Sequence, residues 1–391
     1  WYLPGSARLE TNNSNKIYQP IARASRKEPY FSGSLIYIAM RGLLLFSSFL
    51  LAIFSCQRPS NGVLQNANPP VHLPLDEGKL LETIAFGSCN KQDAPQEMWQ
   101  HVLLHKPQLW MWMGDNIYGD SEDMQVLAEK YALQNSHPEY RQLLAQCPII
   151  GIWDDHDYGK NDGDKNYPKK KESKALMLDF LGVPAKAAVR SREGAYQSYT
   201  IGPKGKKVKI LLLDARYFRD ELTTNPLRNP RYFENPDGDI LGEAQWKWLE
   251  SELTNSEAQL HLIVSGIQYI PEEQIFEKWA NFPAARKRFL NLLVKTKPAG
   301  ALLLSGDRHI AELCRIEMYG LDQPLYELTS SGLTHTWSDG SEEPNRFREG
   351  NLIVMKNFGL MQIDWKGPKP AVTLEVRGLG DALFLQKRIQ F

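Results

Sequence analysis

Cysteine is scarce in this 391-residue sequence, and neither sign of charge is in excess. The four cysteines have no CxxC or other paired spacing, which argues against a zinc knuckle or a disulfide framework; they are Cys56, Cys89, Cys147 and Cys314. Lys plus Arg equals Asp plus Glu at 46 each, so no chain-wide field exists to hold nucleic acid or an acidic membrane surface. A content of 42% hydrophobic and 24% charged residues excludes disordered, collagen-like and coiled-coil chains. Selectivity for an anionic ligand must therefore come from a local site.

The N-terminal part of the sequence has the features of a targeting signal. Residues 1–39 show no periodicity, and we interpret them as an upstream tail. Residues 40–56 combine Arg41, an apolar run over 43–54 and Cys56, which resembles a bacterial lipoprotein signal with Cys56 as the lipidated residue. An uncleaved anchor and a plain secretory signal are the alternatives. Each version predicts an exported protein, and the first predicts a bacterial lipoprotein at the periplasmic side, the outer membrane or the cell surface.

Residues 57–81 contain Asn, Ser and Pro and are expected to form a flexible linker to a folded body at 82–391. Six short apolar runs in that body are each followed by residues that could act as ligands. The runs are 83–86, 109–113, 149–153, 208–213, 260–264 and 301–304. Helical patterns lie between many of them, over 95–106, 123–146, 170–181, 243–253 and 276–297. This alternation predicts an α/β fold whose ligands gather at the carboxyl ends of the strands.

The pattern changes after residue 310, where strand-like runs follow one another closely. They cover 312–317, 325–329, 351–356, 360–365 and 372–376. Such spacing predicts a second, more antiparallel sheet packed on the first. Because no linker separates the two regions, we expect one catalytic domain with two sheets.

The polar clusters after the strands have the composition of a metal site. Several buried carboxylates repel one another unless cations lie between them. Asp115 could bridge two cations, which two-metal hydrolases hold roughly 3.5 to 4 Å apart. A thiolate from Cys89 and a phenolate from Tyr118 favour a trivalent ion such as ferric iron. The remaining candidate ligands are Asp154 or Asp155, Asn161, Asp307 and His309.

Other roles remain open for several of these residues. His156 is the candidate proton donor to the leaving group, or it contacts only the phosphate. Cys89 could be a small buried hydrophobic residue, and Tyr118 could simply pack at the sheet edge. Arg216 could pair with Asp214 instead of contacting the substrate.

The motifs occur in the order Gly87-Ser88-Cys89, Gly114-Asp115-Asn116-Ile117-Tyr118, Trp153-Asp154-Asp155-His156-Asp157 with Asn161, Leu213-Asp214-Ala215-Arg216 and Ser305-Gly306-Asp307-Arg308-His309. This set, over about residues 82–365, resembles the alkaline phosphatase D (PhoD-like) family of the calcineurin-like metallophosphoesterases. The resemblance implies an αββα sandwich of two mixed sheets flanked by helices. It also implies a dinuclear centre with iron and calcium, and hydrolysis of phosphate monoesters and diesters. We expect Fe³⁺ with Ca²⁺, with Zn²⁺ or Mn²⁺ as alternatives that would weaken the resemblance, and attack on phosphorus by a metal-bound hydroxide.

Carried over residue by residue, the family's metal ligands fall on Cys89, Asp115, Tyr118, Asp154, Asn161, Asp307 and His309, with Asp155 as the alternative to Asp154. The resemblance makes Arg216 a phosphate contact. We predict His156 and Arg216 as the catalytic residues, and Asn116 and Arg308 as further substrate contacts. Gln268 departs from the wider superfamily, which often has His after that strand. Its position is then either vacant or contacts a harder ion through the amide oxygen.

Two other functions compete with that of a phosphoester hydrolase. One is a phosphodiesterase that acts on phospholipid head groups or polymer-linked diesters. The other is a lipid-anchored protein that binds metal or phosphate without turnover. The expected partners are a phosphoester substrate and, through the N-terminal signal or lipid, a membrane; we expect a monomer.

Overall fold

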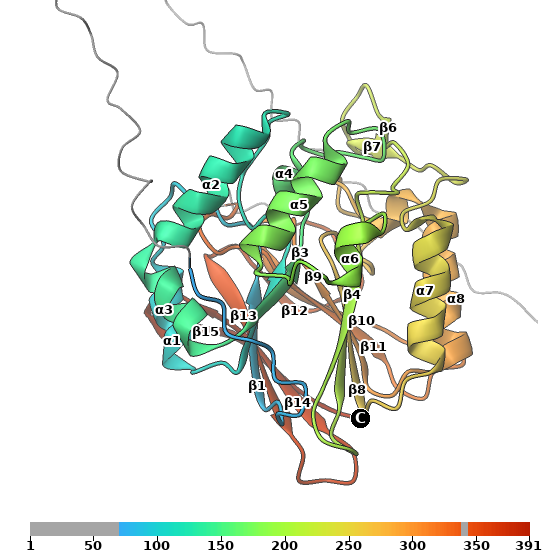
Figure 1. Cartoon of the computed structure of the whole chain (residues 1–391). Coiled ribbons are helices and arrows are strands. Elements are labelled where there is room, and N and C mark those ends of the chain that lie inside the picture. Colours follow the sequence, from blue (N-terminus) through green and yellow to red (C-terminus); the bar gives the residue numbers. More distant parts are fainter. Residues whose placement is uncertain (1–69, 338–342) are drawn as a thin grey trace, which may run out of the picture. The chain divides into compact units, whose positions relative to one another are not determined.

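The computed structural model describes residues 70–337 and 343–391. The predictions for the upstream tail, the signal, Cys56 and most of the linker therefore lie outside the described residues. Two large sheets form the centre of the described chain, and a short hairpin of β6 (Thr223–Thr224) and β7 (Tyr232–Phe233) lies apart from them (Figure 1). No helix within the described ranges is long and apolar enough to cross a membrane.

The first sheet has six strands, with parallel strands on one side and antiparallel strands on the other. In spatial order they are β15 (Leu383–Gln390), β14 (Ala371–Gly378), β13 (Asn357–Asp364), β1 (Thr83–Gly87), β2 (Leu109–Met113) and β3 (Ile149–Ile152). Strands β1, β2 and β3 run parallel, so their carboxyl ends lie at one edge. Strand β1 also pairs antiparallel with β13.

The second sheet has seven strands and is also mixed. Its order is β12 (Arg348–Ile353), β10 (Ala311–Ile316), β11 (Leu325–Ser330), β9 (Ala301–Ser305), β8 (Leu260–Ser265), β5 (Val208–Leu212) and β4 (Gln197–Ile201). Strands β5, β8, β9 and β11 are parallel, whereas β4 and β10 run the other way. Strand β12 pairs antiparallel with β10 and so has the direction of the parallel strands. Three of the predicted ligand-bearing runs therefore end in this sheet.

Alternation of side chains along the second sheet separates its two faces. Leu262 and Val264 belong to a core that also contains residues of the first sheet, while Ile263 between them belongs to a second core. That second core includes α7 (Gly242–Thr254) and α8 (Pro283–Thr296). The period of two in a strand thus places the two sheets face to face, with α7 and α8 outside the second sheet.

Helices on the other side cover the first sheet. They are α1 (Met98–Leu104), α2 (Met124–Ser136), α3 (Pro138–Gln146), α4 (Asp155–Tyr158), α5 (Lys170–Phe180) and α6 (Ala188–Ser191). Figure 1 shows α1 to α3 on the opposite side of the strands from α7 and α8. This layering confirms the αββα sandwich of two mixed sheets.

One prediction from the strand pattern was wrong. The strands after residue 310 do not form a separate antiparallel sheet, because β10 to β12 extend the second sheet and β13 to β15 extend the first. Short-range spacing identifies strands but not their partners, and pairing here joins segments far apart in sequence. The pattern also missed β4 and β15, whose side chains alternate less clearly between buried and exposed.

The predicted helix over 276–297 was also wrong in its first part. The α-helix begins at Pro283, which has no backbone N–H to lose at a first-turn position. Residues before it form only a short 3₁₀ turn at Trp279–Asn281. The segment before Pro283 places Glu277 in the interior near the ends of the strands, as described below.

Candidate metal centre

The candidate ligands follow the parallel strands of both sheets at a constant offset. Cys89, Asp115 and Asp154 are each the second residue after β1, β2 and β3, and Asp307 is the second residue after β9. The sheets face each other with these ends at the same edge, so ligands from two sheets form one cluster. The sequence predicted that the ligands gather at the carboxyl ends of the strands. In the structure, strands of both sheets contribute to this edge.

Four of these candidates have a left-handed backbone that is unusual for residues with a side chain. The φ angles are 60° for Cys89, 50° for Asp115, 68° for Asp307 and 54° for His309. Such conformations each cost of order 1 kcal/mol and persist where function requires them. Here they turn the chain sharply after each strand and direct successive side chains into the cluster.

One group of donors surrounds the Oδ2 atom of Asp115. The Sγ of Cys89 and the Oη of Tyr118 each lie 3.4 Å from it. The Nε2 of His309 lies 2.8 Å from the same Tyr118 oxygen. Cys89, Asp115 and His309 each offer a ligand atom within 4.8 Å of the others. A thiol, a phenol, an imidazole and a carboxylate therefore converge at one point.

A second group of donors consists of carboxylates. Asp154, Asp155 and Asp307 also offer ligand atoms within 4.8 Å of one another, and Asp155 approaches Asp115 to a similar degree. Asp115 thus belongs to clusters on both sides, as its predicted bridging position requires. Because Asp154 and Asp155 are both in the second group, the structure brings together both alternatives.

Glycines allow this close approach around Asp154. A Cβ on Gly114 would lie 2.4 Å from the Cβ of Asp154, and one on Gly266 would lie 2.2 Å from its Oδ1. Gly114 also has a φ of 97°, which side-chain-bearing residues rarely adopt. A glycine at position 114 therefore allows both the positive φ of the turn after β2 and the close approach of Asp154.

The buried carboxylates have too few hydrogen-bond partners of their own, as expected of groups that bind cations. Oδ2 of Asp154 and Oδ1 of Asp155 are buried without a hydrogen-bond partner. Burial, with the neighbouring carboxylates, raises the pKa of Asp115 and Asp307 well above the ordinary value. Burial also lowers the pKa of His309 to about 3, so its imidazole is neutral and able to bind a metal. Cations would supply the missing partners and remove the repulsion, so the donor set fits a metal centre.

His156 lies beside the cluster with its ring stacked on Tyr118 at a centroid distance of 4.0 Å. Its Nδ1 is 2.8 Å from Oδ1 of Asp120, which leaves Nε2 as the free nitrogen. Burial lowers the pKa of His156, but the carboxylates of Asp155, Asp115 and Asp120 outweigh it and raise that pKa to about 11. No motif in the sequence singled out Asp120.

Arg216 is fully buried in a chain of ion pairs. Its Nε lies 2.6 Å from Oδ1 of Asp154, and its Nη1 lies 2.6 Å from Oε2 of Glu277. Glu277 also pairs with Arg219, whose Nε is 3.0 Å away. Arg216 does not pair with the side chain of Asp214 in this way; its backbone N–H donates to that carboxylate. A direct substrate contact by Arg216 stays a prediction, since its present contacts are with protein carboxylates.

Three further predicted residues lie around the centre without joining it. Asn161 is exposed, and its amide donates to the carboxylate of Asp162 at 2.7 Å. Asn116 is buried, and its Oδ1 has no partner. Arg308 is almost fully buried and pairs with Glu343 at 2.6 Å. The predicted ligand role of Asn161 and the substrate roles of Asn116 and Arg308 remain untested.

Gln268 is directed into a different polar network. Its Nε2 donates to Oε1 of Glu312 at 2.7 Å and to Oγ1 of Thr329 at 2.9 Å. The amide oxygen accepts a long hydrogen bond from Gln274 at 3.4 Å. These contacts connect Gln268, which follows β8, to side chains of β10 and β11.

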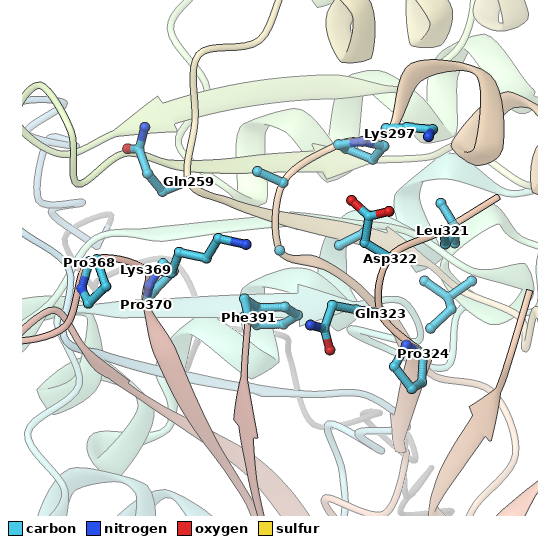
Figure 2. Close-up of a pocket in the computed structure, with 15 residues that line it drawn as sticks. Gln259, Lys297, Leu321, Asp322, Gln323, Pro324, Pro368, Lys369, Pro370 and Phe391 are labelled. Atoms are coloured by element: carbon cyan, nitrogen blue, oxygen red, sulfur yellow. The ribbon is translucent and has the colours of Figure 1, made fainter.

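The pocket of Figure 2 lies at the other end of the second sheet. It has a volume of about 260 Å³ and is lined by Ala301 and Leu325, the first residues of β9 and β11. Because β9 and β11 are parallel, this is the edge opposite the candidate ligands. None of the predicted site residues lines this pocket. The chemistry therefore belongs to the carboxyl-end cluster.

Two facing mixed sheets with a shared carboxylate centre at their common edge define a metallophosphatase fold. A family model described as PhoD-like phosphatase matches residues 84–366. The chain belongs to the PhoD-like phosphatase family. This match confirms the resemblance and agrees with the prediction of a hydrolase for phosphoric esters.

Individual relatives support the same assignment. Alkaline phosphatase D of Bacillus subtilis (strain 168) is 26% identical over 265 residues, which cover 58% of this chain and 46% of that protein. The chain thus spans about half the length of this curated relative. A structure of PhoD has a TM-score of 0.59 at 16% identity and covers 83% of this chain and 73% of that one. GAP50, the anchor in the inner membrane complex of Plasmodium, has a TM-score of 0.52 at 10% identity, covering 80% and 90%. These two structural similarities show the fold.

Proposed function

We propose that this protein is an exported, metal-dependent hydrolase of phosphate esters. The observation that carries the proposal is the position of Asp115 between two groups of buried donors, one with Cys89 and His309 and one with Asp155. Membership of the PhoD-like phosphatase family supports it. Export and lipidation of Cys56 rest on the sequence alone.

The residues of the centre divide into those that hold cations and those that handle the substrate. Cys89, Tyr118 and His309 would hold one cation, Asp154, Asp155 and Asp307 the other, and Asp115 both. Cations in such a pair act as Lewis acids and lower the pKa of bound water from 15.7 towards about 7. The soft and phenolic donors of the first group favour Fe³⁺, and the oxygen donors of the second favour Ca²⁺.

His156 is suited to donate a proton to the leaving oxygen. Its Nδ1 is held by Asp120 at 2.8 Å and its ring by Tyr118, so Nε2 keeps a fixed direction. Nε2–H would transfer its proton as the ester bond breaks, which produces a neutral alcohol. A role limited to phosphate binding is the alternative, and removal of the imidazole separates the two by its effect on kcat or on KM.

Arg216 contributes by holding Asp154 through the 2.6 Å ion pair. Substrate contacts by Asn116 and Arg308, and a direct one by Arg216, belong to the same proposal. Assays with a monoester, a small diester and a phospholipid would decide which class of substrate the protein hydrolyses.

The test is metal analysis and activity on one preparation of the full chain. We expect bound metal and hydrolysis of a chromogenic monoester or diester, and loss of both in Asp115→Asn, because one bridging carboxylate oxygen becomes a neutral amide nitrogen. Glu250, which forms an exposed pair with Lys295 between α7 and α8, provides the control Glu250→Gln. Bound metal without turnover of any ester would indicate a binding protein, and absence of metal from active protein would contradict the centre.

A further inference from the structure

The segment after β11 is attached to the loops that carry the candidate ligands. The N–H of Leu333 donates to the carbonyl of Ser88 at 3.2 Å, and the N–H of Thr334 donates to that of Cys89 at 3.4 Å. At the other end of the segment, the N–H of Trp337 donates to the carbonyl of His309 at 3.1 Å. Residues between these points are therefore held at a fixed position relative to two candidate ligands.

His335 lies in this segment and contacts the same phenol as His309. Its Nε2 is 3.0 Å from Oη of Tyr118. Its ring centroid is 4.2 Å from that of His309 and 5.1 Å from that of Tyr118. His156 stacks on the Tyr118 ring as well, but its Nδ1 is bonded to Asp120. His156 and His335 therefore have different hydrogen-bond partners.

Thr334 contacts the other ring nitrogen of His335. The Thr334 Oγ1 lies 3.1 Å from Nδ1 of His335 and accepts the N–H of Lys91 at 2.8 Å. Its single hydroxyl proton can go to Nδ1 or to the carbonyl of Cys89 at 3.2 Å. Donation to Nδ1 leaves the proton of a neutral imidazole on Nε2, which faces Tyr118.

We propose that His335 is a positioning residue of the metal centre, which donates a hydrogen bond from Nε2 to the phenolate of Tyr118. A phenolate has no proton to give, so its oxygen needs donors beside the cation, and His335 is a side chain placed to be one. The bond fixes the direction of the Tyr118 ring and stabilises its charge. This inference rests on the proposed function, since it assumes that Tyr118 binds a cation.

The test measures metal retention in the full chain. Metal-free protein is reloaded with Fe³⁺, or with Zn²⁺ in a parallel sample, and the half-life of the bound ion against excess chelator is followed by elemental analysis. We expect His335→Leu to shorten that half-life by about 10- to 100-fold, as loss of a hydrogen-bond partner of a metal ligand does elsewhere. His335→Gln should restore most of it, because the Gln amide can donate from a similar position.

A double-mutant cycle separates action through Tyr118 from an independent role. If His335 acts through the phenolate, then Tyr118→Phe combined with His335→Leu should release metal no faster than Tyr118→Phe alone. His105, whose Nε2 pairs with Asp381 at 2.7 Å, provides the matched control His105→Leu, which should retain metal normally.

Additive effects in the double mutant, or no rescue by His335→Gln, would overturn the proposal. So would unchanged metal retention in His335→Leu with loss of rate only, which would indicate a direct substrate contact. Thr334→Val offers a second route, because it removes the hydroxyl that orients His335 and should produce the same loss in smaller degree. Wild-type protein that retains neither ion contradicts the proposed function itself, which is a different result from any of these.

Discussion

Side chains of one type have different protonation behaviour in the centre because their neighbours differ. Asp115, Asp154 and Asp307 all have a raised pKa, chiefly because burial disfavours the charged carboxylate. Asp155 is equally buried, yet His156, Arg216 and the N–H of Asp162 lower its pKa to about 2. Four carboxyl groups of one cluster therefore differ in charge because their hydrogen-bond and charge partners differ.

The role of His156 predicts a separation of rate from metal content. His156→Ala should lower kcat by about 10²- to 10⁴-fold, because the leaving oxygen then lacks a proton donor, while bound metal stays unchanged. Elemental analysis and steady-state kinetics with an ester of a poorly acidic alcohol measure the two quantities. The control His105→Ala should keep full rate. A His156→Ala enzyme with wild-type kcat would contradict the proton-donor assignment.

The same histidine predicts a pH effect on the stability of the metal-free protein. The folded-state pKa of His156 is about 11, above the unfolded value of about 6.5, so protonation favours the folded state. Its contribution is fully present below about pH 6.5 and is lost as the pH rises through 11. In chelator, the stability advantage of wild type over His156→Gln should therefore shrink between pH 7 and pH 11. Urea unfolding at both pH values measures it, and a constant difference would contradict the shift.

At the level of elements, the loops after the strands determine the site more than the strands do. The segment between β8 and α8 is an example, because its residues were expected to continue a helix. Instead it leaves helical geometry until Pro283, and Glu277 lies between two arginines with at most 2% of its side chain exposed. A helical start at residue 276 would direct this carboxylate elsewhere and leave the Arg216 guanidinium with Asp154 as its remaining ion-pair partner.

This arrangement predicts a large loss of stability in Glu277→Gln. Arg216 and Arg219 would keep buried positive charges with less compensation, and breaking a buried ion pair costs about 3–5 kcal/mol. Chemical denaturation measures the free energy of unfolding. Glu250→Gln, in an exposed pair with Lys295, should lose less than about 1 kcal/mol. Equal losses in the two variants would show that the Glu277 pairs contribute no more than surface ones.

At the scale of the whole molecule, each sheet joins segments that are far apart in sequence. Strand β1 pairs with β13, and Thr83 lies opposite Gln362 in that register. The sandwich is described for residues 70–337 and 343–391, so the predicted attachment to a membrane through Cys56 concerns a part of the chain outside it.

The hypothesis that Cys56 is lipidated predicts the behaviour of Cys56→Ser in a bacterial host. A serine cannot receive the lipid, so the protein should move from the membrane fraction to the soluble fraction and keep its specific activity. Fractionation followed by an ester-hydrolysis assay measures both. Unchanged partitioning would contradict lipidation and favour an uncleaved anchor.

The sequence by itself determined the strands that carry ligands and most of the ligand types. Apolar runs such as 109–113 are buried whatever their partners, and Gly-Asp pairs directly after them have few other uses. The strand partners, the start of α8, and the parts played by Asp120, Glu277 and His335 were decided only by the tertiary structure. The physical reason is that burial and turn formation are local properties of a segment. Pairing of strands and of charges depends instead on which distant segments the closed sandwich brings together.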